Sequence, residues 1–100
     1  MSEQEESWGF ATPPFKAEES LEQLRRSLRS LGLVERSGGF EFEAKRALEF
    51  ELQDGAIAIR LARRLIRTPE FDKFAIKSGA DQRKLLDEVK KRLARWKDEE

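Results

Sequence analysis

The chain lacks histidine, cysteine and tyrosine entirely, and it has one methionine and three prolines among its 100 residues. Without histidine or cysteine it has no imidazole general base, no thiol nucleophile and none of the side chains that usually hold zinc or haem. A disulfide is excluded as well, so the fold does not depend on an oxidising compartment. These absences favour a non-enzymatic protein that uses no cofactor.

A long apolar run and a net charge are also missing. No stretch approaches the roughly 20 apolar residues of a membrane span, and the N-terminus is acidic and polar, unlike a signal peptide. Twenty basic and twenty acidic residues give a formal charge of zero. This balance removes the simplest electrostatic reason for binding nucleic acid or an anionic membrane. We therefore expect a cytoplasmic protein without a membrane partner.

The length suits one domain with a modest core. Residues 1–14 are expected to be a mobile acidic arm, because their Glu/Ser/Gln start and Thr-Pro-Pro end leave little apolar surface to bury. Residues 15–100 are expected to form a single α+β domain. Trp8 and Phe10 are unusual on such an arm, since large aromatics either fold back over an exposed edge of the core or bind a partner. Both interpretations remain open.

The strongest local signal lies in residues 46–62, where two alternating runs flank Asp54-Gly55. Asp-Gly supplies the positive φ angles that a two-residue hairpin turn needs. Centring the turn there brings three apolar pairs onto one face: Leu52 with Ile57, Phe50 with Ile59, and Leu48 with Leu61. On the other face Glu49 lies opposite Arg60, a pair worth about 0.2–1 kcal/mol. The segment predicts a hairpin with one apolar and one polar face.

Two segments have the periodicity of amphipathic helices. Apolar residues spaced four and three apart predict a helix over about 17–31: Ala17, Leu21, Leu24, Leu28 and Leu31. Ser78, with an acid three residues later, predicts the start of a second helix over about 79–97. Its apolar stripe consists of Leu85, Leu86, Val89, Leu93 and Trp96. The first stripe covers only two heptads, so core packing is favoured over a coiled coil.

The remaining alternating runs predict further strands. Residues 33–36 and 40–43 flank a Gly-Gly turn, and residues 71–77 predict a last strand. A three-residue connection at 44–46 would set Phe42 opposite Leu48, and Phe40 opposite Phe50.

Residues 56–67 leave an alternative open, because their Ala, Leu and Arg content also suits a helix. As a strand, the segment would need a bulge beyond Leu61 to point Ile66 inward. We predict the strand. The whole pattern indicates an α+β fold, an antiparallel meander of about four or five strands with helices 17–31 and 79–97 packed on one face.

Two features invite a functional interpretation. Residues 56–67 contain four arginines and no acid, namely Arg60, Arg63, Arg64 and Arg67. Clustered on a sheet, they could bind three or four phosphates of a single-stranded nucleic acid, although solvated or ion-paired arginines are the simpler interpretation. Glu49 and Glu51, about 7 Å apart on one strand, have a spacing compatible with a two-carboxylate hydrolase. Because they lie beside Arg60, we interpret them as ion-pairing residues.

The function indicated is a small non-enzymatic binding or accessory module. It would contact another protein through the polar face of the sheet or through Trp8 and Phe10. Binding of single-stranded nucleic acid or another polyanion through the four arginines is the alternative. An open edge strand, at 33–36 or 70–77, could instead support self-association by strand addition.

Overall fold

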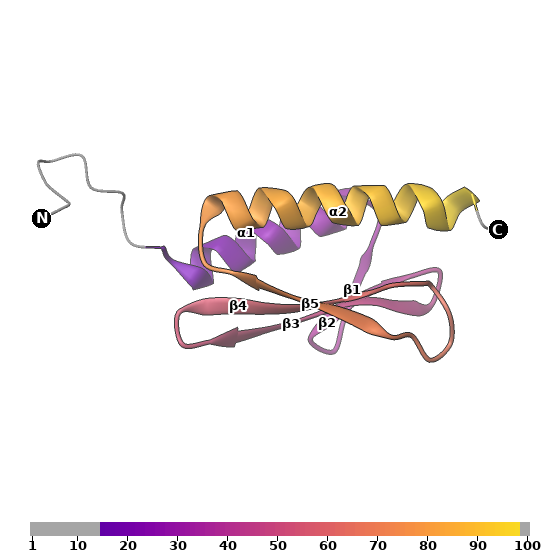
Figure 1. The fold of residues 1–100 in the computed structure, drawn as a ribbon, viewed down its shortest axis with the longest axis horizontal. Coiled ribbons are helices and arrows are strands. Elements are labelled where there is room, and N and C mark those ends of the chain that lie inside the picture. Colours follow the sequence, from indigo (N-terminus) through magenta and orange to yellow (C-terminus); the bar gives the residue numbers. More distant parts are fainter. Residues whose placement is uncertain (1–14, 99–100) are drawn as a thin grey trace, which may run out of the picture.

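Two helices lie on one face of a five-stranded antiparallel sheet in the computed structural model, which describes residues 15–98 (Figure 1). The elements follow in the order α1 (Ala17–Ser30), β1 (Val34–Arg36), β2 (Gly39–Phe42), β3 (Lys45–Gln53), β4 (Ala56–Ala62), β5 (Phe71–Ile76) and α2 (Gly79–Asp98). The strands pair in sequence order, so the sheet is a meander. The predicted α+β fold is confirmed. The predicted arm, residues 1–14, lies outside the described residues.

The central hairpin of β3 and β4 has the predicted register. Leu48 lies opposite Leu61, Phe50 opposite Ile59, and Leu52 opposite Ile57. Asp54 and Gly55 form the turn with φ angles of 49° and 76°, a left-handed conformation that glycine adopts without steric cost. Ala56–Ala62 is a strand, so the helical alternative for residues 56–67 is wrong.

The core lies between the helices and the sheet. Leu24 and Leu28 of α1, with Leu85 and Val89 of α2, are at most 2% exposed. They pack in one cluster with buried side chains of the strands: Phe40, Leu48, Ile57, Ile59, Leu61 and Ile76. Burying one such side chain completely stabilises the fold by about 1.5–3 kcal/mol. No helix within residues 15–98 is long and apolar enough to cross a membrane.

Both helices have ends that the sequence encodes. At the end of α1 the N–H of Leu33 donates to the Leu28 carbonyl at 3.2 Å, which is the long hydrogen bond of a Schellman motif. At the start of α2 the Ser78 hydroxyl accepts the Asp81 N–H at 3.2 Å. The Asp81 carboxylate accepts the Lys77 N–H at 3.0 Å. The N-cap predicted at Ser78 is therefore confirmed.

The register of β2 and β3 differs from the prediction. Phe40 lies opposite Leu48, and Phe42 lies opposite Lys45, with an irregularity after Phe40. The ring of Phe40 still faces the helices, 5.9 Å from the ring of Phe50. The aromatic side chains therefore stay on the apolar face although their partners change.

The cause of this difference is the connection itself. It consists of two residues, Glu43 and Ala44, with φ angles of 53° and 66°. The predicted three-residue connection at 44–46 is wrong. Neither glutamate nor alanine favours a left-handed conformation, so no local signal marks this turn.

The β1–β2 turn lies one residue earlier than predicted. Ser37 and Gly38 form it, with φ angles of 48° and 74°, whereas Gly39 begins β2 and is buried. A Cβ atom at Gly39 would collide with the Leu48 carbonyl oxygen and would lie 2.8 Å from the guanidinium carbon of Arg46. Gly39 is thus required by the close approach of β3 and not by the turn.

Strand β4 ends at Ala62, and residues 63–70 form an irregular connection to β5. The Arg63 N–H donates to the Glu70 carbonyl at 2.9 Å and closes this connection at its base. Ile66 is 47% exposed. The predicted bulge that would turn Ile66 inward is therefore wrong, whereas the strand predicted at 71–77 is present as β5.

The substitution Gly39→Ala tests the close approach of β2 to β3. The added methyl must push the backbone of β3 away. We therefore expect the free energy of unfolding to fall by about 3 kcal/mol, the upper end of the cost of overpacking. The control Gly38→Ala adds a methyl with no atom within 4 Å and should cost only about 1 kcal/mol for its left-handed backbone. Urea unfolding followed by circular dichroism measures both. Equal losses would contradict the steric role of Gly39.

Candidate functional site

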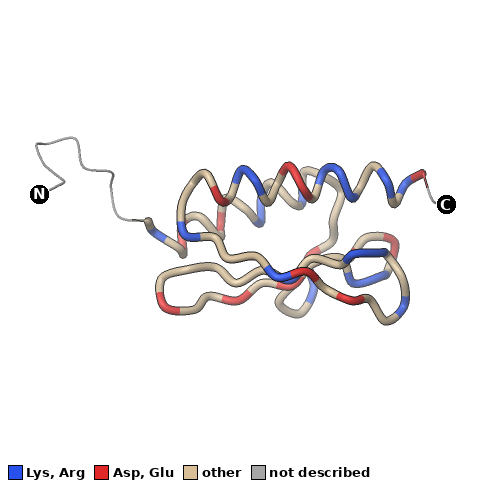
Figure 2. The backbone as a smooth tube through the Cα atoms, viewed as in Figure 1, with Lys and Arg blue, Asp and Glu red and all other residues tan. Residues whose placement is uncertain are grey.

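The face of the sheet away from both helices carries three of the candidate residues, Glu49, Glu51 and Arg60. Side chains alternate along a strand, so the residues between the buried ones point to this side. We call it the open face and define it by the side chains of Glu49, Glu51, Ala58, Arg60, Lys73 and Ala75. Figure 2 shows acidic and basic residues interspersed along the strands. The open face is therefore polar and mixed in sign.

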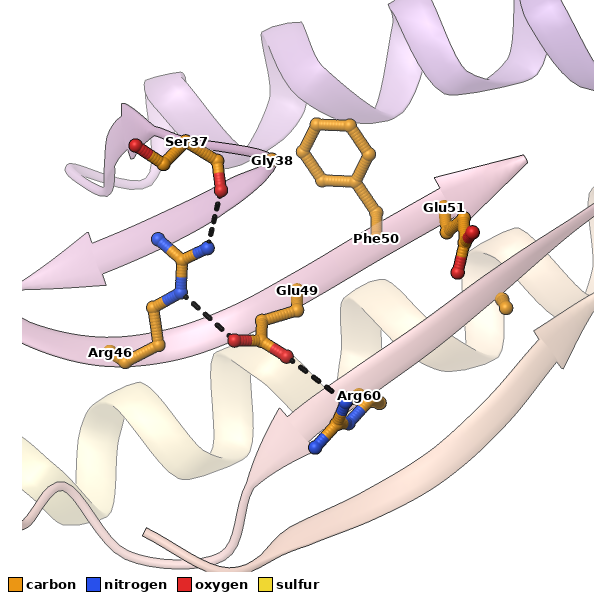
Figure 3. A pocket seen from close by; sticks show the side chains of 8 residues that line it. Ser37, Gly38, Arg46, Glu49, Phe50, Glu51 and Arg60 are labelled. Carbon is orange, nitrogen blue, oxygen red and sulfur yellow. Dashed lines mark hydrogen bonds and ion pairs between the residues drawn. The ribbon is translucent and has the colours of Figure 1, made fainter. Parts of the chain in front are cut away.

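A shallow hollow of about 320 Å³ lies on the open face beside the β1–β2 turn (Figure 3). It is lined by Ser37, Gly38, Arg46, Glu49, Phe50, Glu51, Ala58 and Arg60. Glu49 joins two guanidinium groups. One carboxylate oxygen accepts from Arg46 Nε at 3.3 Å, and the other lies 3.4 Å from Arg60 Nη1. The predicted pairing of Glu49 with Arg60 is confirmed, and Arg46 is a second ion-pair partner of Glu49 that was not predicted.

Arg46 fixes one wall of this hollow. Its Nη1 donates to the Arg36 carbonyl at 2.6 Å, and its Nη2 donates to the Ser37 carbonyl at 2.7 Å. The guanidinium group thus ties the β1–β2 turn to β3, and its side chain is only 22% exposed. Sequence reasoning missed this role because it placed Arg46 in a connection. Its carbonyl partners lie nine and ten residues away, so no local pattern marks them.

The geometry of the two carboxylates favours binding over hydrolysis. Both oxygens of Glu49 are engaged by arginines, which leaves none for a substrate. Glu51 lies opposite Ala58 and accepts a hydrogen bond from Gln53 Nε2 at 3.1 Å, so its predicted ion pair is absent among residues 15–98. The same residues contain no group of three or more acidic side chains that could hold a metal ion. The hollow offers instead the exposed carboxylate of Glu51 and the half-exposed guanidinium of Arg60.

The four predicted arginines do not form one cluster on the sheet. Only Arg60 lies in a strand, and its guanidinium carbon is 5.0 Å from the centre of the Phe71 ring, a cation–π contact. The other three, Arg63, Arg64 and Arg67, lie in the connection between β4 and β5 and are exposed. Their proposed placement on the sheet is therefore wrong.

Asp72 shows that Arg63 lies on the opposite side of the sheet from Arg60. Asp72 pairs with Leu61, whose side chain is buried beneath the helices, so its carboxylate points to the helix side. It accepts from Arg63 Nε at 2.7 Å and from Arg92 Nη2 at 2.8 Å. These two hydrogen bonds, that from Arg63 first, lower the pKa of Asp72. Arg63 also lies 3.3 Å from a carboxylate oxygen of Glu70.

Arg92 of α2 is a structural residue that sequence reasoning missed. It is 9% exposed, and its Nη1 donates to the carbonyls of Ala62 at 3.0 Å and Leu61 at 3.3 Å. Its Nε donates to Glu88 at 2.8 Å. The one signal was a charged residue three positions after Val89, on the apolar stripe of the helix. With each guanidinium nitrogen bonded, Arg92 stabilises the fold and is not free to bind a ligand.

Lys73 is another residue that sequence reasoning did not single out. It lies directly opposite Arg60 on the open face, so two cations face each other across β4 and β5. Lys73 is exposed and forms no ion pair within residues 15–98. A like-charge pair of this kind is unfavourable. Trp8 and Phe10, the other predicted site residues, lie outside the described residues, and their role stays a prediction.

The lowered pKa of Asp72 makes its contribution to stability depend on pH. The carboxylate stabilises the folded state above the unfolded pKa of about 3.9, and this contribution disappears as pH falls through the lower folded value. Asp72→Asn should therefore be less stable than the wild type at pH 7, and the difference should shrink below about pH 4. Urea unfolding across this range measures the difference. Asp87→Asn, at an exposed position of α2, serves as the control. A difference in stability between the wild type and Asp72→Asn that does not change with pH would contradict the stabilising role of the Asp72 carboxylate.

Comparison of the chain with protein-family models, curated proteins and solved structures found no match, so its function is inferred from its own geometry.

Proposed function

We propose that this protein is a small non-enzymatic interaction module that binds another protein through the open face of its sheet. The proposal rests on the observation that the helices cover only one face of the sheet. Within residues 15–98 the other face is left to solvent (Figure 1). The hollow around Glu49 is the centre of the contact. Its charged groups are held by the hydrogen bonds and ion pairs described above, so binding orders few additional side chains.

The chemistry of the hollow indicates the kind of partner surface that fits. It carries two arginines and two glutamates, so its formal charge is zero, and Ala58 supplies apolar contact. Arginine side chains are enriched at protein interfaces, and rigid polar groups select a partner with matching donors and acceptors. A protein surface of mixed charge therefore suits this hollow better than a polyanion does.

Binding of single-stranded nucleic acid is the alternative function, and it has less support. Arg60 shares its charge with Glu49, and Arg63 shares its charge with Asp72 and Glu70. Among the four predicted arginines, Arg64 and Arg67 alone form no ion pair within the described part of the chain. Two arginines can neutralise few phosphates and therefore release few counterions from a nucleic acid, so we expect its affinity to be weak.

A charge-neutral double substitution tests binding through the open face. Arg60→Ala combined with Glu51→Ala removes the two exposed charges of the hollow and leaves Glu49 with Arg46. Partners captured from the cells that make this protein should be lost, with affinity in purified pairs falling about tenfold or more, as for an interface hot spot.

The control for this experiment is Lys90→Ala combined with Asp87→Ala, which removes one base and one acid from the exposed surface of α2. This variant should retain every partner. Retention of all partners by the open-face variant, or equal losses in the two variants, would refute the proposal. Thermal unfolding of both variants shows whether either has lost its fold.

Fluorescence anisotropy with labelled oligo-dT and oligo-rU at low salt tests the alternative function. We expect no binding at protein concentrations of tens of micromolar, because two of the four arginines are already ion-paired and the other two can bind few phosphates. Saturable binding that Arg64→Ala with Arg67→Ala weakens, and that the open-face variant leaves unchanged, would favour nucleic acid over a protein partner.

A further inference from the structure

Strand β5 is an edge of the sheet, and none of residues 15–98 pairs with its outer side. The Arg63 N–H bond to the Glu70 carbonyl continues the register of β4 and β5. The alternation of an antiparallel ladder then turns the backbone groups of residues 72, 74 and 76 toward β4, and those of residues 71, 73 and 75 outward. Lys77 agrees with this alternation, because its N–H donates to Asp81 and not to β4. The outer side of β5 is thus a template for one more strand.

The charges beside this edge indicate what such a strand would carry. One row of charged residues crosses the three strands on the open face. It consists of Glu49 on β3, Arg60 on β4 and Lys73 on β5, so one negative charge is followed by two positive charges. Arg60 has a carboxylate on one side only, and Lys73 has none within residues 15–98. A carboxylate on the outer side of Lys73 would relieve the repulsion between the two cations.

A second hollow, of about 300 Å³, lies next to this row on the open face. Small side chains create it, since Ala58 and Ala75 lie directly opposite each other. Its lining consists of Gln53, Asp54, Ala56, Ile57, Ala58, Ala75 and Lys77. Ala75 is two residues from Lys73, so a strand with a large apolar residue two positions from its acid would place that residue against this hollow.

We propose that the strand is the chain's own N-terminal segment, residues 1–14, laid along β5 with Glu6 beside Lys73 and Trp8 beside Ala75. The segment contains three glutamates and no base, and Glu6 and Trp8 share one face of an extended chain. Folding back of the arm, one of the two interpretations of Trp8 and Phe10, thereby gains a defined site. The inference does not rest on the proposed function, because it is argued from the unpaired edge of β5 and from Lys73 and Ala75, none of which lines the hollow around Glu49.

The direction of the added strand follows from the chain connection. Figure 1 shows that α1 begins at the end of the molecule where β5 ends and α2 begins. A segment that runs along β5 and then enters α1 must therefore run parallel to β5. The five residue-to-residue steps from Phe10 to Phe15 span up to about 17 Å, which is available for the passage from the edge of the sheet to α1.

Amide hydrogen exchange of the full chain, resolved by residue with NMR, tests this arrangement. We expect the outward amides of Phe71, Lys73 and Ala75 to be protected in the wild type. Trp8→Ser should abolish that protection, whereas residues 72, 74 and 76 should keep theirs through β4. Unprotected outward amides in the wild type would overturn the proposal, and so would protection that Trp8→Ser leaves unchanged.

A charge exchange tests the register. Glu6→Lys or Lys73→Glu alone should speed exchange of the outward amides by about fivefold, the upper end for one cross-strand ion pair, and the two changes together should restore the wild-type rate. Glu3→Lys is the matched control, because it makes the same charge change on the same segment at a position with no assigned contact. Failure of the double variant to recover, or an equal effect of the control, would overturn the register.

Dilution distinguishes the chain's own segment from that of a second copy. Protection that is constant with concentration, in a chain that sediments as a monomer, supports the intramolecular strand. Protection that disappears together with a dimer would assign the strand to a neighbouring copy and would overturn the proposal.

Discussion

The pairing of β3 with β4 is the constraint on which the rest of the molecule depends. Its register places Leu48 and Ile59 on the same side, where both are almost completely buried. A shift of one residue would exchange the two faces of the hairpin and expose that side. Each buried side chain contributes about 1.5–3 kcal/mol, whereas the Glu49–Arg60 pair contributes about 0.2–1 kcal/mol. The apolar face therefore decides the register, and the ion pair is compatible with it.

This register also explains the charged residue in the core. β5 continues the alternation of β4, which brings Phe74 and Ile76 to the helix side and carries Asp72 there as well. A carboxylate under a helix is costly unless it is paired. Arg92 supplies the partner and also binds the Leu61 and Ala62 carbonyls at the end of β4. A cation on the apolar stripe of α2 is thus a consequence of where the strand alternation places Asp72.

The parts of the fold that local signals specify could be predicted, whereas contacts between distant residues could not. Asp54-Gly55 and the leucine spacing of α1 are local, and both predictions hold. The β2–β3 turn uses Glu43 and Ala44 in left-handed conformations that neither residue favours. Nor does a local pattern mark the bonds that Arg46 makes to the β1–β2 turn or the close approach of Gly39 to Leu48, since these contacts join residues nine or ten positions apart. The candidate site was predictable at the Glu49–Arg60 pair for the same reason, because that pair belongs to the local hairpin.

Strand alternation, and not proximity in the sequence, decides which charges act together. Arg60 and Arg63 are three residues apart, so they lie on opposite sides of the sheet and bind different carboxylates. Lys73 is thirteen residues from Arg60 and lies directly opposite it. A net charge of zero therefore conceals a local excess of positive charge on the open face, at the edge formed by β5. In the arginine-rich connection Arg63 is paired with Asp72 and Glu70, whereas Arg64 and Arg67 have no ion pair within residues 15–98. The edge formed by β5 lacks both a carboxylate and a backbone partner within the same residues. Since both deficits occur at the same strand, one extended acidic segment can remove them together.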